Sequence, residues 1–407
     1  MKSLLTSSLL LASSAATAVS CSSTVQAFGA VSHTRLDRLT GVPAWEGCEA
    51  IATAGNDDNV RSDAAHLEGA PRQLHLLPDL ISNEEICCIA AAAEQFDTEH
   101  DTVDHQAAYL CRVIEDGQPV EPAVCAAIDP LLQERLLPYV RQRFGCATAC
   151  VQTVLVRRYL PDERRRLESH FDVSSYATAI ISLSPRGDYD GGLYVQRVPG
   201  VFSRRFVDLD AGDCLVHQFD TMHGVHVPRG SRLSLVVWFS DSAASLKAGT
   251  APWVERAADA GNSEAQFVLG GFHYRGEFGY APDTRLAIRW LSQAAASGNA
   301  LALLHLGSML ASGEVANADL PSLRAIHAPK EGEDVGADEL AVILYERAAV
   351  QGHPTAEYAY GAALLKGDGV APDVARGRSW LERAASQGED EVMAAGWAAD
   401  ELRALAA

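Results

Sequence analysis

The C-terminal part of the chain repeats itself, and this repetition constrains the fold more than any other feature. Residues 253–261 return in closely similar form at 290–298, 344–352 and 380–388, and each copy ends in glycine. The spacing is nearly regular, apart from an insertion at about residues 318–334 that is rich in proline, glycine and charge. We expect each repeat to form a pair of helices. One such pair cannot bury its apolar face alone, so neighbouring pairs should stack into a superhelix with a concave groove.

Shorter motifs recur between these segments and make the repeat specific. They are Leu269-Gly270, Leu306-Gly307 and Tyr360-Gly361, followed by Gly276, Gly313 and Gly367. Together they resemble Sel1-like repeats, which are relatives of the tetratricopeptide repeat, over most of residues 251–395. The resemblance implies an all-α repeat solenoid over residues 251–407, with a groove that holds a protein or peptide. A stabilising appendage without a ligand is the alternative.

The first 73 residues lack the pattern of a folded domain. Lys2 precedes an apolar stretch over residues 4–18, and Ala16-Thr17-Ala18 and Val25-Gln26-Ala27 are two candidate cleavage sites. We therefore expect a signal or targeting peptide over residues 1–27 and delivery to the secretory pathway, either the endoplasmic reticulum lumen or the exterior. A bipartite plastid presequence is the minority alternative. Residues 28–73 are predicted to be a flexible linker.

Charge and cysteine content limit the partners. The formal net charge of −20 argues against nucleic acid or an anionic membrane as a partner, because both require basic patches. After the N-terminus no apolar run is long enough to cross a bilayer, so no membrane span is expected in the mature chain. The sequence has nine cysteines, none beyond Cys214. An oxidising compartment would permit disulfides among them, and buried free thiols are an equally open interpretation.

Residues 74–245 combine two expected helices with many short strands. Ser82 and Glu85 form a capping box before an apolar run, and Asp129-Pro130 is expected to begin a second helix that reaches about Phe144. Short segments rich in Val, Leu, Tyr and Phe follow at 151–159, 176–184, 193–196, 205–209, 213–219 and 232–239. This order predicts an α+β domain, a double-stranded β-helix or jelly roll with supporting helices.

Histidines and one aspartate supply the candidate metal ligands. His170 and Asp172 stand two residues apart at the end of an expected strand, which puts both side chains on one face. An imidazole and a carboxylate on one face can share a metal ion. A third ligand would come from the later segment that holds His217, His223 and His226.

The whole pattern resembles the Fe(II)- and 2-oxoglutarate-dependent dioxygenases, and the prolyl 4-hydroxylase-like branch most of all. The resemblance covers roughly residues 74–241 and rests on His170-x-Asp172, on His223 followed by Gly-Val, and on Arg232 at the start of an apolar strand. It implies that His170, Asp172 and His223 bind Fe(II), with His226 and His217 as wall or supporting residues.

The same resemblance implies how the cosubstrate binds. Arg232 would hold the distal carboxylate of 2-oxoglutarate through a guanidinium fork, and Tyr159 would lie near the same cosubstrate unless it is only a packed aromatic. Two histidines and one carboxylate leave positions on the iron open for 2-oxoglutarate and O₂. Ascorbate dependence is implied as well.

Three functions are therefore open at this point. The first is a dioxygenase that hydroxylates a protein or peptide side chain, with proline as the leading candidate and the repeats presenting the substrate. The second is a small-molecule oxygenase whose repeats serve assembly only. The third is a scaffold in which the oxygenase fold is inactive.

Overall fold

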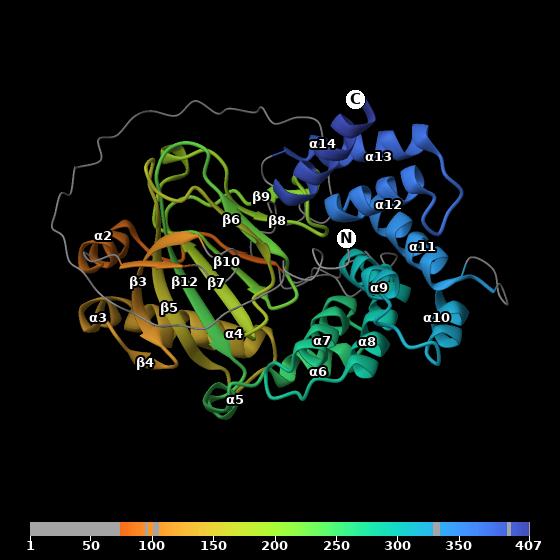
Figure 1. Ribbon diagram of the computed structural model, residues 1–407. Coiled ribbons are helices and arrows are strands. Elements are labelled where there is room, and N and C mark those ends of the chain that lie inside the picture. The colour runs from red at the N-terminus through yellow and green to blue at the C-terminus, as the bar shows by residue number, and fades with distance from the viewer. Residues whose placement is uncertain (1–73, 94–96, 101–105, 329–333, 389–391, 407) are drawn as a thin grey trace, which may run out of the picture.

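The computed structural model describes residues 74–93, 97–100, 106–328, 334–388 and 392–406. The expected targeting peptide and linker lie outside the described residues. The described chain has a strand-rich part followed by an array of helices, as Figure 1 shows. The predicted fold class, a jelly-roll-like domain with supporting helices before a repeat solenoid, is confirmed.

Two antiparallel sheets face each other in the first part. The larger sheet has the order β1-β10-β7-β12-β5-β3-β2, with β4 paired to β3. Its strands are β1 (His75–Leu77), β2 (Asp97–His100), β3 (Ala107–Glu115), β4 (Gln118–Pro119), β5 (Cys150–Tyr159), β7 (Ala177–Ser182), β10 (Cys214–Gln218) and β12 (Arg232–Ser240). The smaller sheet, β6-β11-β8-β9, consists of β6 (Arg166–His170), β8 (Gly192–Val195), β9 (Arg205–Phe206) and β11 (His223–His226).

Successive residues along each strand of the larger sheet face two different apolar cores. Only the residues of one face can reach the space between the two sheets. Val154 and Val156 of β5 belong to the outer core, whereas Leu155 and Tyr159 belong to the core between the sheets. The alternation follows from the period of two in a strand. Residues on the inner face of this sheet therefore point toward the smaller sheet.

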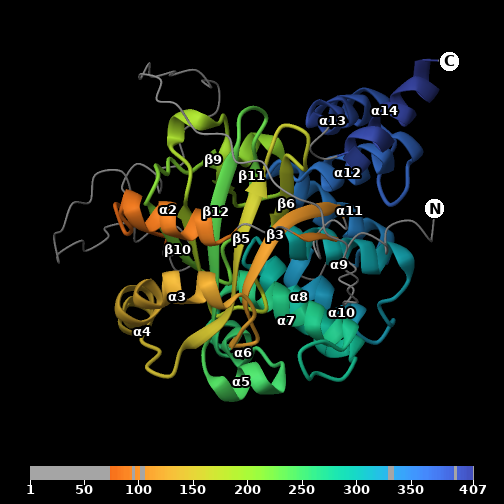
Figure 2. The same ribbon diagram turned by 90° about the vertical axis from the view of Figure 1, so that its left-hand side faces the viewer.

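Helices cover the outer face of the larger sheet (Figure 2). Helix α2 (Asn83–Ala92) has the predicted capping box, because the Ser82 and Glu85 side chains each accept from the other residue's backbone N–H. The second helix begins earlier than expected, at Pro122 rather than Asp129. It continues as α3 (Pro122–Pro130), a π-helical stretch (Leu131–Leu136) and α4 (Leu137–Arg143). Pro122 is the residue that stands in the first turn, where a missing N–H is tolerated.

The repeat array follows the short helix α5 (Ala243–Ala248). Four helix pairs stack, with a further helix, α10, inside the predicted insertion. The helices are α6 (Pro252–Asp259), α7 (Ser263–Arg275), α8 (Thr284–Ala296), α9 (Ala300–Ser312), α10 (Leu320–His327), α11 (Ala337–Val350), α12 (Pro354–Lys366), α13 (Val374–Ser386) and α14 (Val392–Ala406).

The recurring glycines have a backbone cause. Gly276, Gly313 and Gly367 end α7, α9 and α12 in the left-handed conformation, with φ of 72°, 77° and 73°. This conformation is costly for residues with a Cβ, which explains why glycine recurs at the position. No helix in the described part of the chain is both long and apolar enough to cross a membrane.

Candidate metal centre

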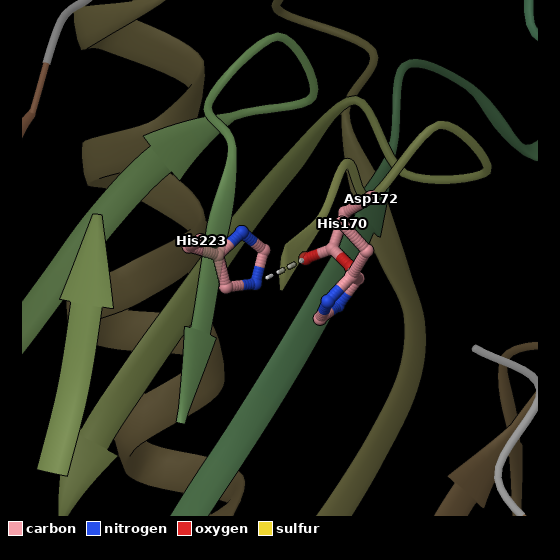
Figure 3. A group of neighbouring side chains, drawn as sticks. All are labelled: His170, Asp172 and His223. Carbon is pink, nitrogen blue, oxygen red and sulfur yellow. Dashed lines mark ion pairs between the residues drawn. The ribbon is translucent and has the colours of Figure 1, made fainter. Parts of the chain in front are cut away.

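Three of the predicted ligands come together at the edge of the smaller sheet, as Figure 3 shows. His170 ends β6 and stands directly opposite His223, the first residue of β11. Asp172 follows two residues after His170. Its carboxylate oxygens lie 3.5 Å from His170 Nε2 and 3.6 Å from His223 Nε2, and one ligand atom from each of the three residues lies within 4.8 Å of the others.

Backbone carbonyls fix which nitrogen of each imidazole can bind a metal. His170 Nδ1 lies 2.9 Å from the Glu168 carbonyl oxygen, and His223 Nδ1 lies 3.1 Å from that of Thr221. Because a carbonyl oxygen only accepts, each Nδ1 must carry the proton and donate it. The lone pair of each Nε2 is therefore left facing the shared space, as in histidines that bind metals.

Two side chains of the larger sheet orient Asp172. Its Oδ2 accepts a hydrogen bond of 2.6 Å from Thr178 Oγ1 and one of 3.0 Å from Trp238 Nε1. Thr178 of β7 stands opposite Trp238 of β12 on one side and His217 of β10 on the other. The three residues form a row on the inner face of the sheet, directly beneath the carboxylate. Sequence analysis did not assign the roles of Thr178 and Trp238.

The charge states suit a metal ion. Burial lowers the pKa of His223 to about 3, so its imidazole is neutral near pH 7. Burial alone would raise the pKa of Asp172, but in the acid range, where this carboxyl titrates, the attraction of the protonated imidazoles of His223 and His170 outweighs burial and holds that pKa below its ordinary value. A neutral imidazole and an ionised carboxylate are the forms that coordinate a cation.

Arg232 and Tyr159 form a second polar cluster inside the barrel. They stand opposite each other on β12 and β5 and are 2% and 1% exposed. Arg232 Nη1 donates to Ser234 Oγ at 3.2 Å, while Arg232 Nε, Arg232 Nη2 and the Tyr159 hydroxyl have no hydrogen-bond partner among the described residues. Buried polar groups rarely lack a hydrogen-bond partner, so the cluster fits an anionic ligand that accepts several hydrogen bonds.

The other histidines lie where they do not complete the cluster of ligands. His217 is fully buried on β10, with its ring centroid 4.4 Å from that of His223. It is thus a wall residue of the barrel. His226 lies at the other end of β11, past a register shift between β11 and β6, and is not among the three residues that share one centre. The seven cysteines of the described residues are free thiols.

Comparison with known proteins gives a family match in the C-terminal part. Residues 263–299, 330–353 and 354–389 match the family model described as Sel1 repeat. A Sel1 repeat protein from Oxalobacter formigenes is 32% identical over 37% of this chain and 95% of its own, with a TM-score of 0.28. Comparison with the curated proteins gives no match.

The N-terminal part is similar to solved oxygenase structures at low identity. An oxidoreductase of the 2OG-Fe(II) oxygenase family from Burkholderia pseudomallei is 20% identical over 42% of this chain and 86% of its own, with a TM-score of 0.36. A prolyl-4-hydroxylase from Pseudomonas putida is 19% identical over 42% of this chain and 92% of its own, with a TM-score of 0.31.

Fold and site together define a chain of two parts, a jelly-roll-like domain with a His-Asp-His cluster and a helical repeat array behind it. The C-terminal part belongs to the Sel1 repeat family.

Proposed function

We propose that this chain is an Fe(II)- and 2-oxoglutarate-dependent dioxygenase that hydroxylates a protein or peptide side chain, with proline as the leading candidate. The observation that carries the proposal is the convergence of His170 Nε2, His223 Nε2 and the Asp172 carboxylate on one point. Two imidazoles and one carboxylate are the ligand set that leaves iron with open positions.

Each residue has a definite task in this reaction. His170, Asp172 and His223 would hold Fe(II), and Thr178 and Trp238 would keep the Asp172 carboxylate turned toward it. Arg232 and Tyr159 would hold the distal carboxylate of 2-oxoglutarate. When bound, iron and 2-oxoglutarate let O₂ convert 2-oxoglutarate to succinate and CO₂ while one oxygen atom enters the substrate as a hydroxyl group.

The proposal also covers the role of the repeats, the need for ascorbate and the cellular compartment. The repeat groove would bind the protein or peptide substrate, ascorbate would maintain the iron as Fe(II), and the chain would work in the secretory pathway. The domain boundaries proposed for this activity are residues 74–245 for the oxygenase and 251–407 for the repeats.

The test measures 2-oxoglutarate turnover by the full chain. We expect Fe(II)-dependent succinate formation that falls at least about 100-fold in His170→Ala, because loss of mere supporting partners already costs 10–100-fold. Arg229→Lys, which changes an exposed arginine outside the cluster of ligands, should remain close to wild type. Equal turnover in wild type and His170→Ala would overturn the proposal.

A second measurement addresses the substrate. Proline-containing peptides captured by the full chain are incubated with Fe(II), 2-oxoglutarate and O₂ and then analysed by mass spectrometry. A mass gain of one oxygen atom on a captured peptide supports the peptide hydroxylase. Succinate formation that only small molecules stimulate would point to the small-molecule oxygenase instead. Metal binding without any turnover would favour the scaffold.

A further inference from the structure

The first repeat is joined to the oxygenase domain through a shared core. Trp253 of α6 and Phe272 of α7 belong to the same apolar cluster as the outer face of the larger sheet, and Trp253 contacts Tyr176 with ring centroids 6.1 Å apart. Arg256 Nη2 donates to Asp241 Oδ2 at 2.8 Å at the rim of this core.

One contact of the first repeat reaches the loop that leads into β11. Asn262 Nδ2 donates to Asp220 Oδ2 at 2.7 Å, and Asp220 lies between β10 and β11. Thr221, the next residue, offers its carbonyl oxygen to His223 Nδ1. The first repeat therefore holds the loop that orients the His223 ring.

The fourth repeat holds a second loop of the oxygenase domain. Gln387, 1% exposed at the end of α13, accepts a hydrogen bond of 3.1 Å from the Val201 N–H through its Oε1. Its Nε2 donates to the Gly352 carbonyl oxygen at 3.4 Å and to Glu357 Oε2 at 3.3 Å. The approach is close at Gly200, which has a φ of +119°, because a Cβ there would lie 3.0 Å from Gln387 Oε1.

This second loop also borders the His223 strand. It follows β8, whose last residue, Val195, stands opposite His223. The Gln196 N–H then donates to the Met222 carbonyl oxygen at 3.0 Å. Helix α12 also approaches this loop, since a Cβ at Gly200 would lie 3.2 Å from Pro354 Cγ, while α6 lies at the other end of the array in Figure 1. The first and fourth repeats thus hold the two loops that border His223.

We propose that the repeat array is a positioning element for the metal centre, with Asn262 and Gln387 as the positioning residues. Strand β11 has only four residues, and because it runs antiparallel to β8, the loop before β11 and the loop after β8 both lie at its His223 end. Asn262 fixes the loop before β11, and Gln387 fixes the loop after its neighbour β8. The metal part of this inference rests on the proposed function.

The chain offers isosteric variants with matched controls. Asn262→Asp keeps the oxygen that accepts from the Ala265 N–H at the start of α7, but it replaces the donor that faces Asp220 with a second carboxylate oxygen. Asn299→Asp is the control, because Asn299 caps α9 through the same bond to the Ala302 N–H, inside the array.

Gln387 of the fourth repeat offers a second pair of test and control variants. Gln387→Glu keeps the acceptor for Val201 but puts a carboxylate against Glu357. Gln351→Glu is its control, since Gln351 stands at the matching position one repeat earlier and donates to the Gly298 carbonyl oxygen at 2.9 Å. The double variant Asn262→Asp with Asp220→Asn reverses donor and acceptor and should restore the contact.

Hydrogen–deuterium exchange of the full chain tests the positioning itself. We expect faster amide exchange over residues 193–206 in Gln387→Glu and over residues 214–226 in Asn262→Asp. The two controls and the double variant should exchange these segments like wild type. Unchanged exchange in both test variants would overturn the inference, whatever the enzyme does.

Titration of the metal-free protein with Co(II) tests the consequence for the centre. We expect about 10-fold weaker Co(II) binding in each test variant, as for the loss of other partners that orient metal ligands, and recovery in the double variant. Loosened loops with unchanged Co(II) affinity would overturn the link to His223. If wild type itself binds no Co(II), the proposed function fails, and the exchange measurement still decides whether the repeats hold the loops.

Discussion

Arg232 carries a permanent charge into the interior of the barrel, and the described residues give it one hydrogen bond, to the Ser234 hydroxyl. The guanidinium also lies over the Tyr189 ring, 5.9 Å from its centroid, but a buried charge that lacks hydrogen-bond acceptors is costly, so the arrangement makes sense when an anion completes it. The neighbouring Tyr159 hydroxyl also lacks a partner among these residues and could donate to the same anion. At the scale of single residues, this cluster supports a carboxylate-bearing cosubstrate.

Replacement of the guanidinium fork should therefore weaken cosubstrate binding. Arg232→Lys keeps the charge but loses the paired donors, and hydrogen bonds to charged groups contribute about 1.5–3 kcal/mol. We expect the KM for 2-oxoglutarate to rise about 10–100-fold in assays of succinate formation. Arg229→Lys, an exposed arginine that pairs with Asp190 at 2.7 Å, is the control and should leave this KM unchanged. An unchanged KM in Arg232→Lys would remove Arg232 from the cosubstrate site.

The sequence predicted some of these neighbours and missed others for a physical reason. The alternation of a strand puts His170 and Asp172 on one side, and the family pattern singled out His223 and Arg232. That Thr178 and Trp238 bind Asp172 depends on the register between β7 and β12, which pairs Thr178 with Trp238. This register cannot be predicted from the local sequence, because it is set when strands that are distant in the sequence pair with each other.

At the scale of elements, strand β11 lies between β6 and β8 with very little space around Gly224. A Cβ at this glycine would lie 2.4 Å from the Tyr194 hydroxyl oxygen and 2.7 Å from the Leu167 carbonyl oxygen. The second of these atoms belongs to the backbone of β6 and cannot rotate away. The residue after His223 must therefore be glycine, which has no Cβ.

Gly224→Ala should both destabilise the fold and disturb the metal centre. We expect a loss of about 1–3 kcal/mol in the free energy of unfolding, typical of an overpacked interior, together with weaker Co(II) binding. Chemical denaturation and metal titration measure the two effects. Gly396→Ala is the control: nothing lies within 4 Å of its Cβ position in α14, so alanine should be neutral or stabilise by up to about 1 kcal/mol. Wild-type behaviour of Gly224→Ala would contradict the packing argument.

Element boundaries were predictable only where a local signal marks them. The capping box at Ser82 is such a signal, and that prediction is confirmed. The recurring glycines of the repeats are another local signal, since the structure places them at the ends of α7, α9 and α12. The start at Pro122 was missed because Asp129-Pro130 offered an equally good start in the sequence. A π-helical stretch directly after Pro130 lets the chain remain helical there. Helix α10 was missed because the insertion has the composition of a loop.

At the scale of the whole molecule, the acid stability of the fold should depend on buried histidines in the repeats. His353 is 4% exposed, and neither of its ring nitrogens has a partner among the described residues. Burial lowers the pKa of His353 to about 4, from an ordinary value of 6.5. Between these two values the unfolded chain binds more protons than the folded one, so stability falls as the pH is lowered.

The effect of His353 can be isolated by comparing two pH values. At pH 5.5 it should reduce the free energy of unfolding by about 1 kcal/mol relative to pH 7.5, since one pKa unit corresponds to about 1.4 kcal/mol. His353→Gln cannot take up this proton, so its stability should decrease less over the same range. Thermal or chemical unfolding at both pH values measures the difference. An equal decrease in both proteins would show that His353 is not the cause.

The attachment of the array at both ends has a consequence for its length. A solenoid fixed at one end can gain or lose a unit, since each unit touches only its neighbours. Here Asn262 of the first unit and Gln387 of the fourth reach two loops of the same domain. Removal of one unit would shift the fourth by a full step and leave Val201 without its acceptor. The two attachments thus fix how many units stand between the first and the fourth.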